Sequence, residues 1–295
     1  MGRGPDHRRM DSGDTEPLDE DQVLAALAEA ARLRQHPILR PTAQGPDACV
    51  VTDGGRLPAA LLDDGRLEAS SVVANCSMNR ERQLTGVNSY QRELGFDPVD
   101  VLTARIDRRD TSGRVGPQVG WLDLCCGSGR ALVQAVARLR AAGLDGEVAV
   151  VGVDLVSPFD NACVDGAGPT PVTCSVTAWT PDRAFDLITC VHGLHYVGDK
   201  LAVLTRAAGW LTAGGLLVAD LDLTGIRLPD GRPAGRRLST QLRAAGFAYD
   251  SRRKRITLVG HRAVELPYTY LGADDQAGAN YTGQPAVRSY YRQDD

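Results

Sequence analysis

The chain has 295 residues, of which 43% are hydrophobic and 24% charged, and its net charge is −4. This length suits one large α/β domain with an appendage, or two small domains. The mild negative charge argues against a nucleic-acid scaffold, which usually presents a strongly basic face. The sequence contains no run of about 18 apolar residues, so it predicts no membrane span.

The cysteines predict neither a disulfide framework nor a metal site. The seven cysteines form no C-x-x-C pair, and nothing supplies four metal ligands at the usual spacing. Several lie in apolar runs, where a free cysteine packs as a small hydrophobic residue. The first residues also lack the apolar core of a signal peptide. We therefore expect no bound metal and a cytoplasmic protein.

The N-terminal third predicts three segments. Residues 1–19 are polar and carry both charge signs, which indicates disorder. Residues 20–77 predict an appendage: a helix first, then short β-like runs that include "LPAALL" and "SSVVA", separated by Asp-Gly turns. Residues 78–112 predict an interrupted helical segment, whose second helix begins at Pro98.

Strand and helix patterns then alternate over residues 113–272. The predicted strands cover residues 119–124, 148–153, 171–175, 185–190 and 215–221. The predicted helices cover residues 129–142, a stretch after Pro158, 197–210 and 235–245. This alternation implies a doubly wound parallel sheet with helices on both faces. The last stretch, "RITLVGHRAVELPYTYLG", leaves no room for a helix between its two strand-like runs, so we expect an antiparallel terminal pair.

The stretch "WLDLCCGSGRALV", residues 121–133, reads as a strand, a glycine turn and a helix. Gly127, Gly129 and the positive helix end favour a nucleotide ligand. A dinucleotide motif would place a third glycine where Leu132 stands, and a phosphate-binding loop would place lysine where Arg130 stands. The carboxylate of Asp123 repels a pyrophosphate but suits an amine or a cation.

The next predicted strand, "VAVVGVDLV", ends in a second acid, Asp154. An acid at this place can accept hydrogen bonds from both ribose hydroxyls. A ligand that combines an adenosine ribose, an amine and a positive centre, without a phosphate, is S-adenosylmethionine.

Four motifs in order resemble those of class I S-adenosylmethionine-dependent methyltransferases. "LDLCCGSG" is similar to the first motif, "VVGVDL" to the second, "FDLITC" to the fourth and "LTAGGLLVADL" to the following helix-turn-strand, over residues 115–270. The resemblance implies a methyltransferase with a Rossmann-like domain at 113–272 and S-adenosylhomocysteine as product. It also implies a mostly parallel seven-stranded sheet with an antiparallel terminal strand, a helical lid at 78–112 and a C-terminal tail at 273–295.

The resemblance implies that Asp123 and the loop backbone hold the methionine part of the cofactor and that Asp154 holds its ribose. Further cofactor contacts are expected from Cys125, Gly127, Gly129, Leu155, Ser175, Val176, Cys190, Tyr90 and Arg92. Two positions depart from the family pattern. Cys125 stands where the family most often has its first glycine. Ser175 and Val176 stand where the family usually places an acid near the adenine amine.

The segment "VHGLHY" follows the fourth-motif strand and supplies the candidate catalytic residues. His192 is nearest the strand end, so we expect it to act as the general base, with His195 as the other candidate. Either histidine could instead pack behind the cofactor. In the lid, Tyr90 is expected to cover the sulfonium by cation–π or oxygen contacts. Asn88, Arg82 or Arg92 is expected to bind the cofactor carboxylate, and arginine is suited to bind it by two hydrogen bonds.

The leading hypothesis is a methyltransferase acting on a small molecule, in bacterial specialised metabolism, with no nucleic-acid or membrane partner. The alternative is an enzyme of the same fold that abstracts a proton with a histidine base and cyclises its substrate without methylation. A third hypothesis is a non-catalytic partner that keeps the fold. The tyrosines of the tail could wall a substrate pocket or form a homodimer interface.

Overall fold

The structure is a computed structural model that describes residues 60–74, 82–106, 117–156 and 168–294. The predictions of disorder at 1–19, of the first appendage helix and of a helix after Pro158 lie outside these residues. No helix among the described residues is long and apolar enough to cross a membrane.

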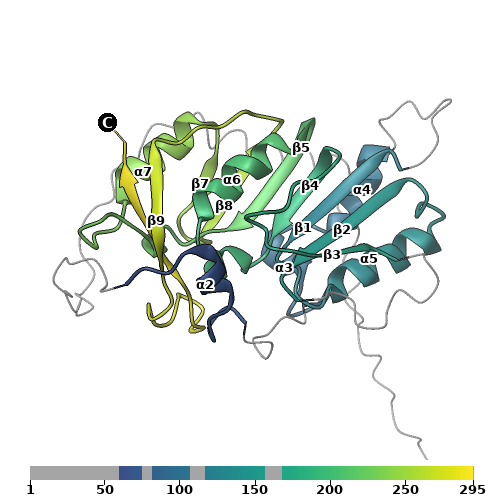
Figure 1. Cartoon of the computed structure of the whole chain (residues 1–295). Helices are drawn as coiled ribbons and strands as arrows, with labels where there is room; N and C mark the ends of the chain where they lie inside the picture. Colours follow the sequence, from purple (N-terminus) through teal and green to yellow (C-terminus); the bar gives the residue numbers. More distant parts are fainter. Residues whose placement is uncertain (1–59, 75–81, 107–116, 157–167, 295) are drawn as a thin grey trace, which may run out of the picture.

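A seven-stranded sheet forms the centre of the molecule, in the order β3-β2-β1-β4-β5-β8-β7 (Figure 1). Its strands are β1 (Val119–Leu124), β2 (Val148–Asp154), β3 (Thr170–Thr173), β4 (Phe185–Cys190), β5 (Leu211–Asp220), β7 (Ala248–Asp250) and β8 (Arg255–Val259). Strands β1 to β5 run parallel to one another, and β8 runs antiparallel to its two neighbours, β5 and β7. The predicted seven-stranded, mostly parallel sheet is therefore confirmed. Every residue of β1 and β4 is buried, as expected for central strands covered on both faces.

Helices cover both faces of the sheet and enclose two apolar cores (Figure 1). The helices are α4 (Pro98–Ile106), α5 (Arg130–Ala141), α6 (Lys200–Gly209) and α7 (Gly235–Ala244). Because side chains alternate along a strand, Trp121 enters the core beside α4 and α5, whereas Leu122 enters the core beside α6 and α7.

Two short helices belong to the segments before the sheet. Helix α2 (Asp64–Glu68) begins after Asp63, whose carboxylate accepts the Arg66 N–H. Helix α3 (Tyr90–Leu94) begins after Ser89, whose hydroxyl accepts the Arg92 N–H. Helices α3 and α4 lie within the segment predicted to be an interrupted helix, and α4 begins at Pro98 as expected, whereas residues 82–89 form no helix.

The β-like run predicted at "SSVVA" is wrong, because residues 70–74 form turns. The Ser70 N–H donates to the Leu67 carbonyl and the Ala74 N–H to the Ser70 carbonyl, so this stretch curls instead of pairing. Only Leu62, at the end of "LPAALL", makes an isolated antiparallel bridge, and its partner is Ala273.

A second sheet contains β6 (Ile226–Arg227), β9 (Tyr268–Asp274) and β10 (Arg288–Gln293), in the order β6-β10-β9. The expected pairing of residues 255–259 with 268–271 is therefore wrong. Strand β8 is held between β5 and β7, and β9 pairs with β10 from the tail. The buried faces of Tyr290 and Tyr291 explain why the tail forms a strand. Two short 3₁₀ helices, η1 (Gly193–Tyr196) and η2 (Leu223–Gly225), complete the described elements.

Hydrogen bonds from the Lys200 side chain connect the second sheet to the start of α6. Its ammonium donates to the carbonyls of Val197 and Val287, at 2.7 and 3.0 Å, and to the Ser289 hydroxyl at 2.7 Å. The side chain is 2% exposed, and this burial lowers the pKa of Lys200 to about 7. Its three donors are therefore all used inside the protein.

Lys200→Met is expected to lower the free energy of unfolding by about 2–3 kcal/mol, because three buried acceptors lose their donor. The loss should grow as the pH rises from 7 to 9. The pKa of Lys200 is lower in the folded than in the unfolded chain, so the unfolded chain binds more protons in this range and the unsubstituted protein gains stability with pH. The difference in the free energy of unfolding between the unsubstituted chain and Lys200→Met should grow by at most about 1.4 kcal/mol per pH unit.

Urea denaturation at several pH values measures this difference. Lys254→Met, at the only other lysine, is the matched control and should differ from the unsubstituted chain by a constant amount. A constant difference for Lys200→Met as well would contradict the account.

Candidate active site

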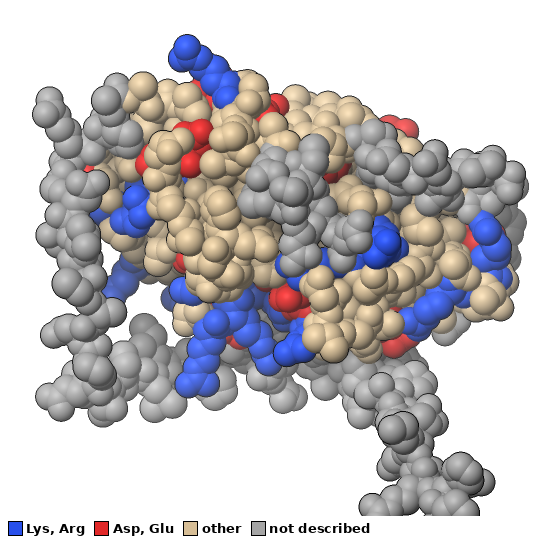
Figure 2. Space-filling view, turned by 90° about the horizontal axis from the view of Figure 1, so that it is seen from below, with Lys and Arg blue, Asp and Glu red and all other residues tan. Residues whose placement is uncertain are grey.

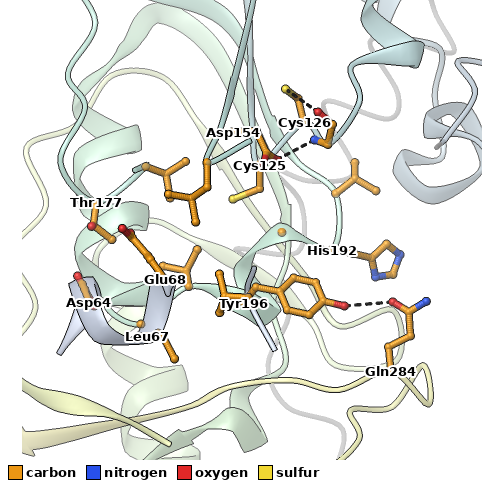
Figure 3. A pocket seen from close by; sticks show the side chains of 18 of the residues that line it. Asp64, Leu67, Glu68, Cys125, Cys126, Asp154, Thr177, His192, Tyr196 and Gln284 are labelled. Carbon is orange, nitrogen blue, oxygen red and sulfur yellow. Dashed lines mark hydrogen bonds between the residues drawn. The ribbon is translucent and has the colours of Figure 1, made fainter. Parts of the chain in front are cut away.

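A cavity lies beyond the carboxyl ends of β1, β2 and β4, with a volume of about 960 Å³ that includes its solvent-open part. In Figure 3, Glu68 and Thr177 lie on one side of this cavity, and His192 lies on the opposite side. Ligand sites of α/β sheets are found at this edge. We call this space the sheet-edge cavity.

The turn after β1 forms one wall of the sheet-edge cavity. Cys125, Gly127 and Gly129 have φ angles of 57°, 61° and 69°, all in the left-handed region. The Gly127 N–H donates to Asp154 Oδ2 at 2.8 Å, so the acid at the end of β2 holds the turn as well as facing the cavity. A non-glycine residue in this conformation costs about 1–2 kcal/mol, which explains the family's preference for glycine at the position of Cys125.

Asp123 is fully buried at the end of β1 and does not line the cavity. Its Oδ2 accepts the Tyr90 hydroxyl at 2.6 Å and its Oδ1 accepts the Thr189 hydroxyl at 2.5 Å. The indole N–H of Trp121 in turn donates to Thr189 Oγ1 at 2.8 Å. Burial raises the pKa of Asp123 to about 7 even though both hydroxyls favour the ionised form. Asp123 thus positions Tyr90, whose side chain lines the cavity and whose hydroxyl is already engaged.

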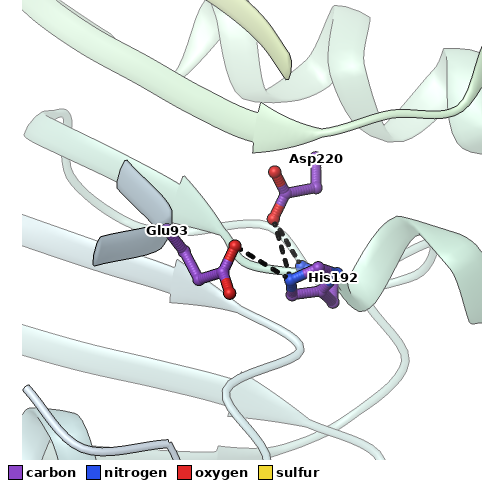
Figure 4. A group of neighbouring side chains, drawn as sticks. All are labelled: Glu93, His192 and Asp220. Atoms are coloured by element: carbon purple, nitrogen blue, oxygen red, sulfur yellow. Dashed lines mark hydrogen bonds and ion pairs between the residues drawn. The ribbon is translucent and has the colours of Figure 1, made fainter. Parts of the chain in front are cut away.

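The candidate base, His192, lies between two carboxylates (Figure 4). Its Nε2 is 3.3 Å from Glu93 Oε2, on α3, and 3.7 Å from Asp220 Oδ2, at the end of β5. The His192 backbone N–H donates to the same Asp220 oxygen at 3.1 Å, and its φ is 60°. The bond to Glu93 places the proton of the neutral ring on Nε2, which leaves Nδ1 as the nitrogen with the lone pair. The two carboxylates compensate the positive charge that the ring gains when it takes up a proton.

The same three side chains also have the ligand types of a metal site, and their ligand atoms lie within 4.8 Å of one another. We interpret them as a hydrogen-bonded triad. Glu93 also pairs with the Arg82 guanidinium at 3.4 Å, and Asp220 Oδ2 accepts the His192 N–H.

The loop after β4 packs directly against the turn after β1. A Cβ atom at Gly193 would overlap Cys125 Cβ and would lie 2.9 Å from the sulfur atoms of Cys125 and Cys190. The neighbouring Cys190 thiol and burial raise the pKa of Cys125 well above its usual value. Both thiols therefore act as packing groups rather than as nucleophiles.

The structure divides the residues predicted to bind the cofactor or the acceptor into two groups. Those that line the sheet-edge cavity are Arg82, Tyr90, Cys125, Gly127, Asp154, Leu155, Val176 and His192. Those that do not line it are Asn88, Arg92, Asp123, Gly129, Ser175, Cys190 and His195.

The residues of the second group have other surroundings. Ser175 donates to the Glu68 carboxylate, and its Oγ accepts the Thr177 N–H. Arg92 is exposed and reaches the Val87 carbonyl at 3.5 Å. His195 is buried on the far side of η1, where it lines a different cavity.

Sequence reasoning missed the cavity residues contributed by the appendage and by the tail. Asp64, Leu67, Glu68 and Val73 come from residues 64–73, and Gln284 comes from the segment before β10, where it accepts the Tyr196 hydroxyl at 3.1 Å. Because Ser175 holds Glu68, an acid does stand near the end of β3, but it is supplied by α2. The only signal in the sequence was the unexplained Ser175 itself.

The charges on the wall fit S-adenosylmethionine. Three carboxylates, those of Asp64, Glu68 and Asp154, face one guanidinium, that of Arg82. Such a wall attracts a cation and repels a pyrophosphate. The acid at the end of β2 is also placed to accept ribose hydroxyls.

Tyr90→Phe is expected to lower the free energy of unfolding by about 2 kcal/mol at pH 8.5 and by clearly less at pH 6. The lost hydroxyl stabilises the ionised form of Asp123, which predominates only above a pH of about 7. Tyr249→Phe is the matched control, because Tyr249 donates to the neutral Leu221 carbonyl at 3.0 Å. Urea denaturation at pH 6 and pH 8.5 measures the free energy of unfolding of both variants. The same loss of stability at the two pH values for Tyr90→Phe would contradict this account.

Gly193→Ala is expected to cost about 1–3 kcal/mol of stability, because the new methyl group overlaps Cys125. In a Cys125→Gly background the same substitution should cost at least about 1 kcal/mol less, since the overlapping Cβ is gone. A double-mutant cycle by urea denaturation measures the coupling. Additive effects would show that the two loops do not press on each other at this point.

The family model described as "Methyltransferase domain" matches residues 87–252. No curated protein matches the chain.

Several solved structures resemble the chain in part. One, StiE O-MT residues 961–1257, is 18% identical over 34% of this chain and 37% of its own, with a TM-score of 0.29. The DszA carbon methyltransferase is 16% identical over 45% of this chain and 36% of its own, with a TM-score of 0.36. The N-methyltransferase NodS from Bradyrhizobium japonicum WM9 is 16% identical over 64% of this chain and 100% of its own, with a TM-score of 0.34. The chain thus spans little more than a third of the length of the first two.

The family model covers more than half of the 295 residues. The sheet order and the cavity beyond the strand ends are those expected from the four motifs. The chain belongs to the family described as "Methyltransferase domain".

Proposed function

We propose that the protein methylates a small molecule and that His192 takes the proton of the acceptor group. The observation that carries this proposal is the position of His192 on the wall of the sheet-edge cavity, with its Nε2 between Glu93 and Asp220. When bound, S-adenosylmethionine supplies a methyl group activated on a sulfonium.

The proposed cofactor contacts follow the cavity wall. Asp154 would hold the ribose, while Glu68 and Thr177 would face the adenine end. The ring of Tyr90 would lie beside the methionine part, where an aromatic side chain stabilises a cation. The carboxylate of Asp123 would act through Tyr90 rather than by direct contact.

The proposed base is positioned from two sides. Glu93 accepts from Nε2, while Asp220 fixes the backbone of the same residue through its N–H. A hydroxyl acceptor beside Nδ1 could then give up its proton as the new bond to carbon forms. Holding the acceptor in line with the methyl group is the other part of the catalysis, because it removes the entropic cost of orientation.

A small-molecule acceptor is supported by the partly enclosed shape of the cavity, whose walls come from the sheet, the appendage and the tail. The arginine-rich composition is the support for bacterial specialised metabolism as the context.

Calorimetric titration with S-adenosylmethionine tests the binding half of the proposal. The unsubstituted chain and His192→Ala are expected to bind, and Asp154→Ala is expected to bind at least about tenfold more weakly because it loses the ribose acceptor. The absence of binding by the unsubstituted chain at millimolar ligand would contradict the proposal.

The chemical half is tested by the release of S-adenosylhomocysteine with a panel of hydroxyl-bearing small molecules and by the mass of the product. His192→Ala should lose a factor of about 10²–10⁴ in turnover. His261→Ala, at an exposed histidine outside the site, should not change it. A product heavier by one methyl group supports the proposal, whereas an unchanged or lighter product would favour proton abstraction without methylation.

A further inference from the structure

A second cavity lies on the other side of η1 from the sheet-edge cavity, and its wall carries positive charge. Its volume is about 940 Å³, including its solvent-open part. It is walled by η1, by residues 222–227 and by the tail segment 277–288. Its charged side chains are Lys200, Arg227, Lys254, Arg288 and, as the only acid among the described wall residues, Asp222. Figure 2 shows that Lys and Arg side chains also lie at several other places on the face seen from below, with Asp and Glu among them.

The two lysines already have partners within the protein. Lys254 lies 3.7 Å from the carboxylate of Asp222, the one acid among the described residues of this wall. Lys200 uses all three of its donors on Val197, Val287 and Ser289. Lys254 is therefore paired with an acid, and Lys200 has no donor left for a ligand.

The two arginines are not compensated in this way. Within the described part of the chain, neither Arg227 nor Arg288 pairs with a carboxylate at ion-pair distance. Arg227 donates from Nη1 to the Gly231 carbonyl at 3.2 Å, while its buried Nε has no hydrogen-bond partner. Burial and the neighbouring Arg288 guanidinium lower the pKa of Arg227. Two like charges at one wall repel each other, and an anion between them would remove that cost.

Two neutral groups on the same wall also lack partners. His195 is 3% exposed, and its buried Nε2 has no hydrogen-bond partner, as is also true of Asn280 Nδ2. Burial lowers the pKa of His195 to about 3, so the ring is neutral at pH 7 and can donate one hydrogen bond. Unpaired buried polar groups are uncommon in folded proteins, so they point to a ligand that pairs with them.

The second cavity adjoins the proposed base. The ring of His195 lies 5.8 Å from that of His192 and 5.4 Å from that of Tyr281, centroid to centroid. The Tyr281 ring is in turn 6.5 Å from His192. Two side chains on the wall of the second cavity, His195 and Tyr281, therefore lie next to the ring of His192.

We propose that the second cavity binds the anionic group, a carboxylate or a phosphate, of the methyl acceptor. Arg227 and Arg288 supply the forked donors that bind either group by two parallel hydrogen bonds. His195 and Asn280 supply neutral donors, and the acceptor's hydroxyl then reaches His192. This inference rests on the proposed function and names the acceptor as an acid.

Anion binding by the full chain tests the inference without any turnover. The probes are inorganic phosphate and benzoate, titrated calorimetrically in the presence of S-adenosylhomocysteine, with sodium chloride at equal ionic strength as the reference. We expect at least one probe to bind in the millimolar range. Phosphate alone would indicate a phosphorylated acceptor, benzoate alone a carboxylate, and both an anion site that accepts either.

Arg227→Gln and Arg288→Gln are expected to weaken the binding of that probe at least tenfold. Arg236→Gln is the matched control, because Arg236 is exposed on α7 and lies outside the cavity. If a glutamine variant does not fold, Arg227→Lys and Arg288→Lys keep the charge, remove the fork and should weaken binding severalfold. Equal binding by the variants and the control, or no binding of either anion, would overturn the inference.

Titration with S-adenosylhomocysteine shows whether a negative result concerns the acidic acceptor alone or the proposed function as well. If the chain binds S-adenosylhomocysteine but neither anion, only the acidic acceptor is wrong. If it does not bind S-adenosylhomocysteine, the proposed function fails as well.

Discussion

The buried carboxylate of Asp123 is the constraint on which the site depends. A carboxylate without water needs donors, and Tyr90 and Thr189 provide them from α3 and β4. The bond to Tyr90 fixes α3 against the end of β1. Glu93 follows Tyr90 by three residues on the same helix, so fixing one places the other on the same face. On that face Glu93 lies 3.3 Å from His192. The position of the proposed base therefore depends on the hydrogen bond between Tyr90 and Asp123.

Backbone strain is concentrated where the two loops meet. Cys125 and His192 are both non-glycine residues with positive φ, and each lies just beyond the carboxyl end of a central strand. Such conformations persist only where surrounding contacts hold them. Asp220 holds His192 through its backbone N–H, and the close packing of Gly193 on Cys125 holds the two loops together. Two of the three described non-glycine residues with positive φ therefore lie in segments that shape the cavity, and the third, Lys254, lies in the turn between β7 and β8.

The sequence predicted the parts of the molecule that local patterns determine. Buried strands read as apolar runs, and the acids at their ends, Asp123 and Asp154, mark the sheet edge because parallel strands end there together. Pairings between distant segments were not predictable in this way. Strand β9 pairs with the tail and not with β8, because both edges of β8 are taken, one by the predicted strand β5 and the other by β7, which the pattern did not predict.

The walls of the two cavities were also not predictable from local sequence patterns, because distant segments form them. Glu68 lies 107 residues before Ser175, to which it is bonded, and no local periodicity connects them. The charge on the wall of the second cavity arises only when β6 and β10 come together. Whether a residue such as Asp123 faces a ligand or supports a neighbour was also not visible, since it depends on Tyr90 packing over it.

The most direct test of the central claim is a crystal structure of the chain with S-adenosylhomocysteine bound. The account predicts the ligand in the sheet-edge cavity, with its ribose hydroxyls within hydrogen-bond distance of Asp154 and its sulfur on the side of His192. Tyr90 should remain bonded to Asp123. A ligand bound elsewhere, or a ribose that does not contact Asp154, would contradict the account.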